Sequence, residues 1–227
     1  MIDTSRLFRL VSLLFLLLLV VLSTDAQVNK RGFSASANIG GNQGFTDVQG
    51  SDLNLTFGGG VNYYINPFLG LKAEFNHGTL SRKLLDRNYK NYTNNYNYLT
   101  STVNVALGQL LKPNEKVAHY MLYNIYMGTG VGVIASNISN TNNLTPDNLG
   151  GITYKGTDIT LPVNLGIDFK FLGFYYTKSP LSFNLNYQHS FAFTEMLDGY
   201  DPPNDNKAKD SFGNLSVGLK YQFYQKK

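Results

Sequence analysis

The chain has 227 residues, a formal net charge of +4, no cysteine and only 15% charged residues. Soluble domains carry about 25% charged residues, so this composition argues against an ordinary water-facing surface. The small net charge gives no reason to expect nucleic-acid binding. The absence of cysteine excludes a disulfide framework and a lipid anchor attached through cysteine. The length suits one domain of moderate size.

The first 26 residues have the layout of a secretory signal peptide. Arg6 and Arg9 supply positive charge, residues 10–22 form an apolar stretch, and small and polar residues lead to Ala26. The apolar stretch is too short to span a bilayer comfortably, because a spanning helix needs about 20 residues. We therefore predict a signal peptide over residues 1–26 and one mature domain over residues 27–227.

Eight runs of alternating apolar and polar residues follow, and each run predicts a β-strand, because successive strand side chains point to opposite faces. The runs lie near residues 33–39, 53–63, 69–76, 99–108, 121–133, 159–169, 181–193 and 214–223. The segments near 41–51, 79–97, 136–156 and 195–211 are long and rich in Asn, Tyr, Asp and Gly, whereas those near 65–68, 112–118 and 171–180 are shorter. This alternation predicts long loops at one end and short turns at the other.

The polar faces of these runs are nearly free of charge and rich in glycine. Their charged side chains are Lys72, Glu74, Asp158, Asp168, Lys170 and Lys220. The apolar faces carry no formal charge, as lipid contact requires, since a basic residue at the bilayer midplane costs about 2–4 kcal/mol. Lipid cannot satisfy open strand edges, so the first and last strands must pair. The predicted fold is all-β: a closed, eight-stranded antiparallel transmembrane β-barrel with long extracellular loops and short periplasmic turns.

Residues 63–71, 128–133, 161–166 and the last strand resemble the small outer-membrane β-barrel proteins of Gram-negative bacteria, of the type common in Bacteroidota. These proteins share the OmpA-like transmembrane barrel and the porin-family barrel domain. The resemblance implies location in the outer membrane, contact with outer-membrane lipid and lipopolysaccharide, and insertion by the barrel-assembly machinery. The assembly signal that it implies in the last strand consists of Ser216, Gly218, Tyr221 and Phe223.

Five lumen charges form the first candidate site: Lys72, Glu74, Asp168, Lys170 and Lys220. An unpaired buried charge is costly, so opposite charges in a narrow polar lumen should pair. Two interpretations remain open. The charges form a structural network that fills the lumen, or they form the gate of a narrow pore.

A second candidate site follows the third strand. Arg82, Lys83, Arg87 and Lys90 lie just beyond the apolar span on the predicted outer side. Cationic side chains make charge-assisted hydrogen bonds to phosphates, so these four residues are predicted to contact lipopolysaccharide. The next segment, residues 88–98, is dense in Tyr and Asn and suits adhesion, because Tyr combines contact area with a polar tip.

We predict no catalytic, cofactor-binding or metal-binding residues and therefore no enzyme activity. His189 and Ser190 are adjacent and would point to opposite faces, so they do not form a nucleophile and base within hydrogen-bond reach. The predicted function is a structural outer-membrane protein, or one whose loops bind a ligand or an unknown protein partner, without nucleic acid. The alternatives are a component of a Bacteroidota secretion or gliding apparatus, a lipid A-modifying hydrolase, and a narrow pore.

Overall fold

The computed structural model describes residues 32–46, 51–82, 91–110, 122–141, 152–170, 180–193, 197–198 and 209–223. The predicted signal peptide and its cleavage position lie outside these residues. The strands are β1 (Gly32–Phe45), β2 (Asn54–Asn66), β3 (Leu69–Arg82), β4 (Asn91–Ala106), β5 (Ile125–Thr141), β6 (Ile152–Lys170), β7 (Leu181–Ala192) and β8 (Ser211–Phe223). A short 3-10 helix, η1 (Leu107–Gln109), follows β4. No helix within the described residues has the length and apolarity needed to cross a membrane.

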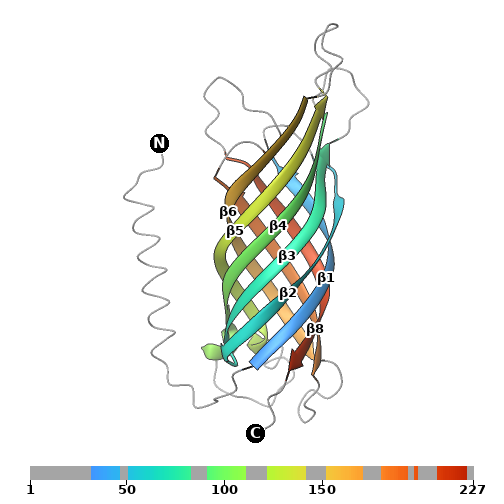
Figure 1. Ribbon diagram of the computed structural model, residues 1–227. Coiled ribbons are helices and arrows are strands. Elements are labelled where there is room, and N and C mark those ends of the chain that lie inside the picture. Colours follow the sequence, from blue (N-terminus) through green and yellow to red (C-terminus); the bar gives the residue numbers. More distant parts are fainter. Residues whose placement is uncertain are drawn as a thin grey trace, which may run out of the picture.

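The eight strands form a closed antiparallel barrel, which confirms the predicted fold (Figure 1). Each strand pairs with its neighbours in the sequence, and β1 pairs with β8 from Phe33 opposite Phe223 to Phe45 opposite Ser211. Closure satisfies the backbone hydrogen bonds of the first and last strands, which lipid could not satisfy.

The barrel has two distinct ends. β1 begins and β8 ends at the same end of the barrel, as an even number of strands requires (Figure 1). The tight β2–β3 turn also lies there, and Asn66 Oδ1 accepts hydrogen bonds of 2.8 Å from the backbone N–H groups of Phe68 and Leu69. In outer-membrane barrels the short turns face the periplasm. We therefore call this end periplasmic and the opposite end extracellular.

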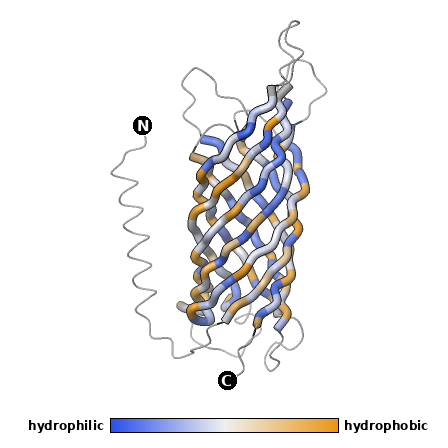
Figure 2. The backbone as a smooth tube through the Cα atoms, viewed as in Figure 1, coloured by the Kyte–Doolittle hydropathy of each residue, from blue (hydrophilic) through white to orange (hydrophobic). Residues whose placement is uncertain are grey.

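Large apolar side chains form a belt around the outside of the barrel. Phe57, Val131 and Leu165 are each more than half exposed, whereas Asn164, next to Leu165, is only 2% exposed. The hydropathy colouring shows this alternation along the strands (Figure 2). The apolar face therefore points outward and the polar face inward, as the sequence predicted for a barrel in lipid.

Inward glycines make room for inward asparagines on the neighbouring strands. Gly128 on β5 lies between Asn104 on β4 and Asn164 on β6. Likewise, Gly58 lies between Asn38 and Asn76, and Gly218 lies between Asn38 and Asn184. A Cβ atom on Gly128 would overlap Asn104 Oδ1. An eight-stranded barrel is only just wide enough for its interior side chains, so a glycine opposite each of these asparagines provides the space that its amide occupies.

Strands β3 to β6 continue past the apolar belt on the extracellular side, where the sequence predicted loops at 79–97 and 136–156. Ser81 pairs with Thr93, Asn95 with Asn137, and Ser139 with Thr153. These strands rise above the remaining strands in Figure 1. The two loop predictions were therefore wrong for the paired parts of these segments.

The polarity of the two faces reverses in this extension. Tyr92, Tyr96 and Ile134 point inward and are buried, whereas Asn95 and Asn137 point outward and are exposed. Beyond the belt the outer face meets water rather than lipid, so apolar side chains are more stable in the interior. The interior of the extension therefore holds packed aromatic and aliphatic side chains beside buried polar ones such as Asn94 and Ser136, which corrects the expectation of a wholly polar lumen.

Replacing Gly128 with Ala should destabilise the barrel by about 1–3 kcal/mol, the usual cost of overpacking. The new Cβ would overlap Asn104 Oδ1 and come within 2.5 Å of the Val103 carbonyl oxygen, which cannot easily move. The midpoint of urea unfolding, followed by gel mobility with and without boiling, measures the effect. Gly70→Ala is the matched control, because its Cβ would make only ordinary contacts of 3.4 Å or more. Equal midpoints for the two variants would contradict this account.

Replacing Leu165 with Arg should lower the free energy of unfolding in lipid vesicles by about 2–4 kcal/mol, because a charge would enter the lipid-facing belt. Asn137→Arg is the control, since Asn137 is also exposed but lies beyond the belt. An exposed site away from lipid should change stability by about 0.5 kcal/mol or less. Similar losses for both variants would contradict the assigned position of the membrane.

Candidate functional site

Lys72 and Glu74 form the first ion pair of the lumen. They lie two residues apart on β3, so their side chains share the inner face, and the Lys72 ammonium contacts Glu74 Oε2. The other carboxylate oxygen, Oε1, accepts hydrogen bonds of 3.0 Å from the amides of Asn38 and Asn76. Both charged side chains are buried. A buried charge needs both a counter-charge and hydrogen-bond partners, and this pair has both.

Asp168 and Lys220 form the second ion pair. Lys220 Nζ lies 2.7 Å and 2.9 Å from the two Asp168 carboxylate oxygens. Asn184 donates a hydrogen bond of 2.6 Å to Asp168 Oδ1, and Lys220 Nζ lies 5.5 Å from the centre of the Tyr126 ring. The Tyr126 hydroxyl donates in turn to Asn186 Oδ1 at 3.0 Å. The network thus joins four consecutive strands, β5 to β8.

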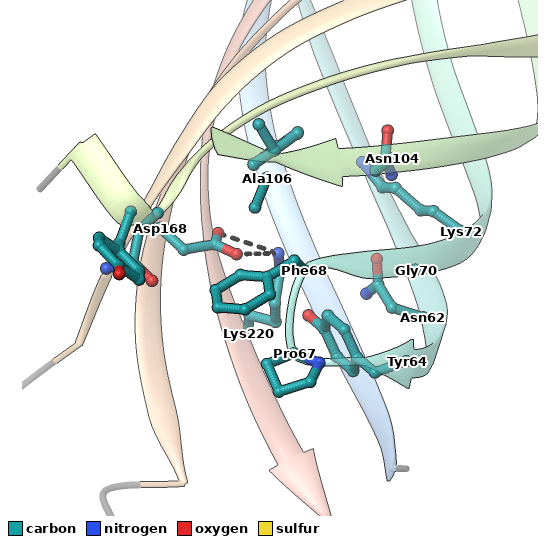
Figure 3. A pocket seen from close by; sticks show the side chains of 13 residues that line it. Asn62, Tyr64, Pro67, Phe68, Gly70, Lys72, Asn104, Ala106, Asp168 and Lys220 are labelled. Carbon is teal, nitrogen blue, oxygen red and sulfur yellow. Dashed lines mark hydrogen bonds and ion pairs between the residues drawn. The ribbon is translucent and has the colours of Figure 1, made fainter. Parts of the chain in front are cut away.

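A cavity of about 230 Å³ borders both ion pairs at the periplasmic end (Figure 3). Lys72, Asp168 and Lys220 line it together with Tyr64 and with Phe68 of the β2–β3 turn. The structure thus brings four of the five predicted lumen charges together. The fifth, Lys170, lies on β6 opposite Ser182, and its side chain lies outside the described residues.

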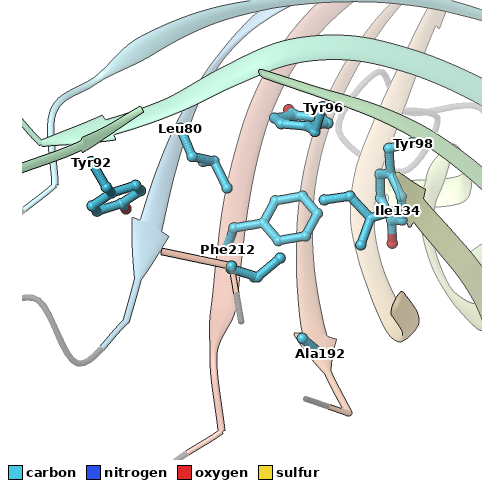
Figure 4. Close-up of a cluster of buried hydrophobic side chains, with 8 residues drawn as sticks. Leu80, Tyr92, Tyr96, Tyr98, Ile134, Ala192 and Phe212 are labelled. Carbon is cyan, nitrogen blue, oxygen red and sulfur yellow. The ribbon is translucent and has the colours of Figure 1, made fainter. Parts of the chain in front are cut away.

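A cluster of buried apolar side chains fills the extracellular part of the lumen (Figure 4). We call it the aromatic plug, and its members are Leu80, Tyr92, Tyr96, Tyr98, Ile134, Ala192, Leu197 and Phe212. The Phe212 ring centre lies 5.7 Å from that of Tyr96 and 5.2 Å from that of Tyr98. These rings occupy the axis along which an ion would have to travel.

The hydroxyl groups of Tyr96 and Tyr98 have hydrogen-bond partners in the lumen. The Tyr98 hydroxyl lies 2.8 Å from Thr160 Oγ1 and donates to Ser190 Oγ at 2.9 Å. The Tyr96 hydroxyl accepts a hydrogen bond of 2.6 Å from the Asn42 amide. Buried hydroxyl groups are costly when unpaired, so these bonds hold the rings in one arrangement.

Leu197, which lies between β7 and β8, also belongs to the plug. Leu197 is fully buried, its N–H donates to Asp210 Oδ2 at 2.8 Å, and its carbonyl accepts from the Asn94 amide at 2.9 Å. Sequence reasoning missed this plug. Tyr92, Tyr96 and Tyr98 were interpreted as part of an adhesive loop, although their even spacing was a visible signal that they share one face of a strand.

The residues of the predicted assembly signal divide between the two faces of β8. Ser216 is buried in the lumen, and Gly218 lies on the same inner face. Tyr221 and Phe223 are about half exposed on the outer face near the periplasmic end, with ring centres 5.2 Å apart. Their recognition by the assembly machinery stays a prediction.

Arg82 does not occupy the position expected of a lipopolysaccharide contact. Its side chain is only 8% exposed and lies on the inner face of β3, as do Leu80 and Gly78. The alternation of side chains along β3 explains this position, because the even-numbered residues of the strand, Arg82 included, point inward. Lys83, Arg87 and Lys90 lie outside the described residues, so the prediction for them stays open.

The described histidines lie on the outer surface. His189 Nδ1 lies 3.2 Å from the Tyr187 hydroxyl on that face, whereas neighbouring Ser190 is buried inside. His77 packs against the ring of Phe57, at 5.3 Å between centres. Within the described parts of the chain, no three His, Asp or Glu side chains lie together in a way that could hold a metal ion.

Removing the ammonium group that pairs with Asp168 should destabilise the barrel. Lys220→Met should cost about 2 kcal/mol or more, somewhat less than the ~3–5 kcal/mol typical of a fully buried pair, because solvent screens an Asp168 side chain that is 21% exposed. Urea unfolding of each variant measures the cost. In a double-mutant cycle, Asp168→Asn with Lys220→Met should cost less than the two single changes added together. Strict additivity would show that the two charges do not interact.

Comparison with known proteins agrees with this architecture. The model of a family described as outer membrane protein beta-barrel domain matches residues 12–223. A comparison with curated protein sequences finds no significant match.

Several solved barrel structures are similar to this chain. Neisserial surface protein A is 14% identical, with 85% of this chain and 97% of that chain covered and a TM-score of 0.49. The Yersinia pestis attachment invasion locus protein Ail, solved with the heparin analogue sucrose octasulfate, is 11% identical, with 86% and 99% covered and a TM-score of 0.48. The N-terminal barrel of Pseudomonas aeruginosa OprF is 11% identical, with 85% and 100% covered and a TM-score of 0.39. Because the family model matches nearly the whole chain, this outer-membrane protein belongs to the outer membrane protein beta-barrel domain family.

Proposed function

We propose that this protein is a non-enzymatic outer-membrane barrel that is closed to ions and presents a rigid binding surface outside the cell. The aromatic plug is the observation that carries the proposal. Its packed rings and Leu197 fill the extracellular part of the lumen, so the interior supports the barrel mechanically and leaves no path for ions.

The pairing of the lumen charges supports the same proposal. Lys72 and Lys220 each contact a carboxylate, and Glu74 and Asp168 accept further hydrogen bonds from neighbouring amides. Charges that are already satisfied offer little to a passing ion. They instead tie together strands that are distant in the sequence, which suits a scaffold.

The placement of His189 and Ser190 gives no support to a lipid A hydrolase. A nucleophile and its base must lie within hydrogen-bond reach, but these side chains lie on opposite sides of the barrel wall. His77 and Thr79 share the outer face of β3. Their hydrogen bonds are to the amide oxygens of Asn97 and Asn95 rather than to each other.

The purified protein in a planar lipid bilayer should show no discrete conductance steps. Phe212→Ala combined with Tyr98→Ala should produce openings, because the two changes remove the central rings of the plug. Phe223→Ala is the matched control, since Phe223 is an outward-facing aromatic residue of the same strand. Both variants should first pass the gel-mobility test for a folded barrel. Steady conductance by the unmodified protein would overturn the closed-barrel proposal and favour the narrow pore.

A further inference from the structure

The outer face of the extracellular extension carries mainly uncharged polar side chains. We call it the polar platform. Its most exposed hydroxyl and amide groups belong to Asn95, Asn97, Asn137, Ser139, Thr153 and Thr157. They lie on three neighbouring strands, β4, β5 and β6. The platform is directly above the apolar belt, because Leu99 on β4 and Ile159 on β6 are the next outward residues along these strands toward the membrane.

The strand register aligns these side chains in rows. Thr79 lies opposite Asn95, Asn95 opposite Asn137, and Asn137 opposite Lys155. Neighbouring strands are about 4.8 Å apart, and residues on one face of a strand recur about every 6.8 Å. The groups therefore form a two-dimensional array with fixed spacing rather than a mobile cluster.

The amides of the platform are oriented by their neighbours. Thr79 Oγ1 donates a hydrogen bond of 2.9 Å to Asn95 Oδ1, and His77 Nδ1 lies 2.9 Å from Asn97 Oδ1. Each of these amide oxygens therefore has a partner on β3. The two NH₂ groups remain on exposed side chains and can donate to a ligand.

The wall behind the platform is rigid. Between the outward residues of β4, Tyr96 and Tyr98 point into the barrel and pack in the aromatic plug, and Ile134 does the same on β5. A ligand would therefore meet groups whose backbone is already held in place. Binding to a preorganised surface avoids part of the ordering cost of association.

The charge of the platform indicates the class of ligand. Lys155 is the only ionic side chain among the described outward residues of β4, β5 and β6 beyond the belt. A surface of this kind does not complement a polyanion, a phosphate cluster or a strongly charged protein patch. Amides and hydroxyls at regular spacing instead match a ligand that carries many neutral hydroxyl groups, each able to donate and accept.

We propose that the polar platform binds the chain of a neutral oligosaccharide at the cell surface. This inference rests on the proposed function, because it names the ligand class of the extracellular surface. His77, which packs against the lipid-facing ring of Phe57, places the lower edge of the platform at the top of the membrane. A sugar chain that leaves the membrane surface, or approaches it, would pass along the rows of Asn, Ser and Thr.

The test uses the full chain in detergent micelles on an array of immobilised glycans. The neutral probes are maltoheptaose and yeast mannan, with a set of neutral blood-group oligosaccharides, and the anionic probes are heparin and polysialic acid. We expect binding to at least one neutral glycan, and this binding should persist in about 0.5 M salt, because added salt screens interactions between charges and not those between neutral groups. Asn95→Ala combined with Asn137→Ala should weaken this binding about tenfold or more, because it removes two amide contacts.

Gln43→Ala is the matched control. Gln43 is an exposed amide on the outer face of β1, away from the platform, and its loss should leave binding unchanged. Asn137→Asp is a second test, because it keeps the shape of the side chain but replaces donor hydrogens with a negative charge, and it should also weaken binding. Gel mobility with and without boiling confirms that each variant is folded.

Three outcomes would overturn the inference. The first is that no neutral glycan binds. The second is that only anionic glycans bind, and that this binding is lost in high salt or in Lys155→Ala. The third is that the protein forms a dimer that the Asn95 and Asn137 changes abolish. A barrel that stays closed in the bilayer but gives any of these results would leave the closed-barrel proposal standing. A barrel that conducts ions but still binds neutral glycans would overturn the closed-barrel proposal and leave the oligosaccharide proposal standing.

Discussion

The structure depends on one constraint: eight strands that close in lipid enclose a lumen only just wide enough for side chains. Every inward group must therefore fit against, and satisfy, the groups beside it. Toward the periplasmic end this is achieved with ion pairs and amides, and with glycines where an amide needs space, as at Gly128 beside Asn104. Toward the extracellular end it is achieved with the packed rings of Tyr96, Tyr98 and Phe212.

These two kinds of interior follow from two kinds of exterior. Where lipid surrounds the barrel, apolar side chains are stable outside, and the polar members of each strand are confined to the lumen. Where the same strands rise into water, the preference reverses, so Ile134 points inward and Asn137 outward. The polar platform and the aromatic plug are therefore two faces of one wall. The interior that closes the barrel also makes the platform rigid.

Much of this architecture could be predicted from residue patterns. The alternation of apolar and polar residues from Leu161 to Phe169 indicates a strand with one apolar face. The absence of charge on that face indicates that it contacts lipid. The lumen charges were also visible, because Lys72, Glu74, Asp168 and Lys220 stand on otherwise neutral polar faces. Their partners were not visible, since Asp168 and Lys220 are separated by 52 positions in the sequence and meet only through the pairing of β6, β7 and β8.

The extracellular extension could not be predicted in the same way. Residues 91–98 alternate Asn or Thr with Tyr or Asn, a pattern that suits an exposed loop as well as a strand. Tyr does not distinguish the two, because its ring can be buried and its hydroxyl can contact water. The sequence by itself determined the number of strands, the lipid-facing side and the need for closure, because these follow from the local period and from the cost of charge in lipid. Only the tertiary structure decided how far the strands continue, which side of them is buried and which charges meet. Those outcomes depend on contacts between strands that are far apart in the chain and on where the surrounding lipid gives way to water.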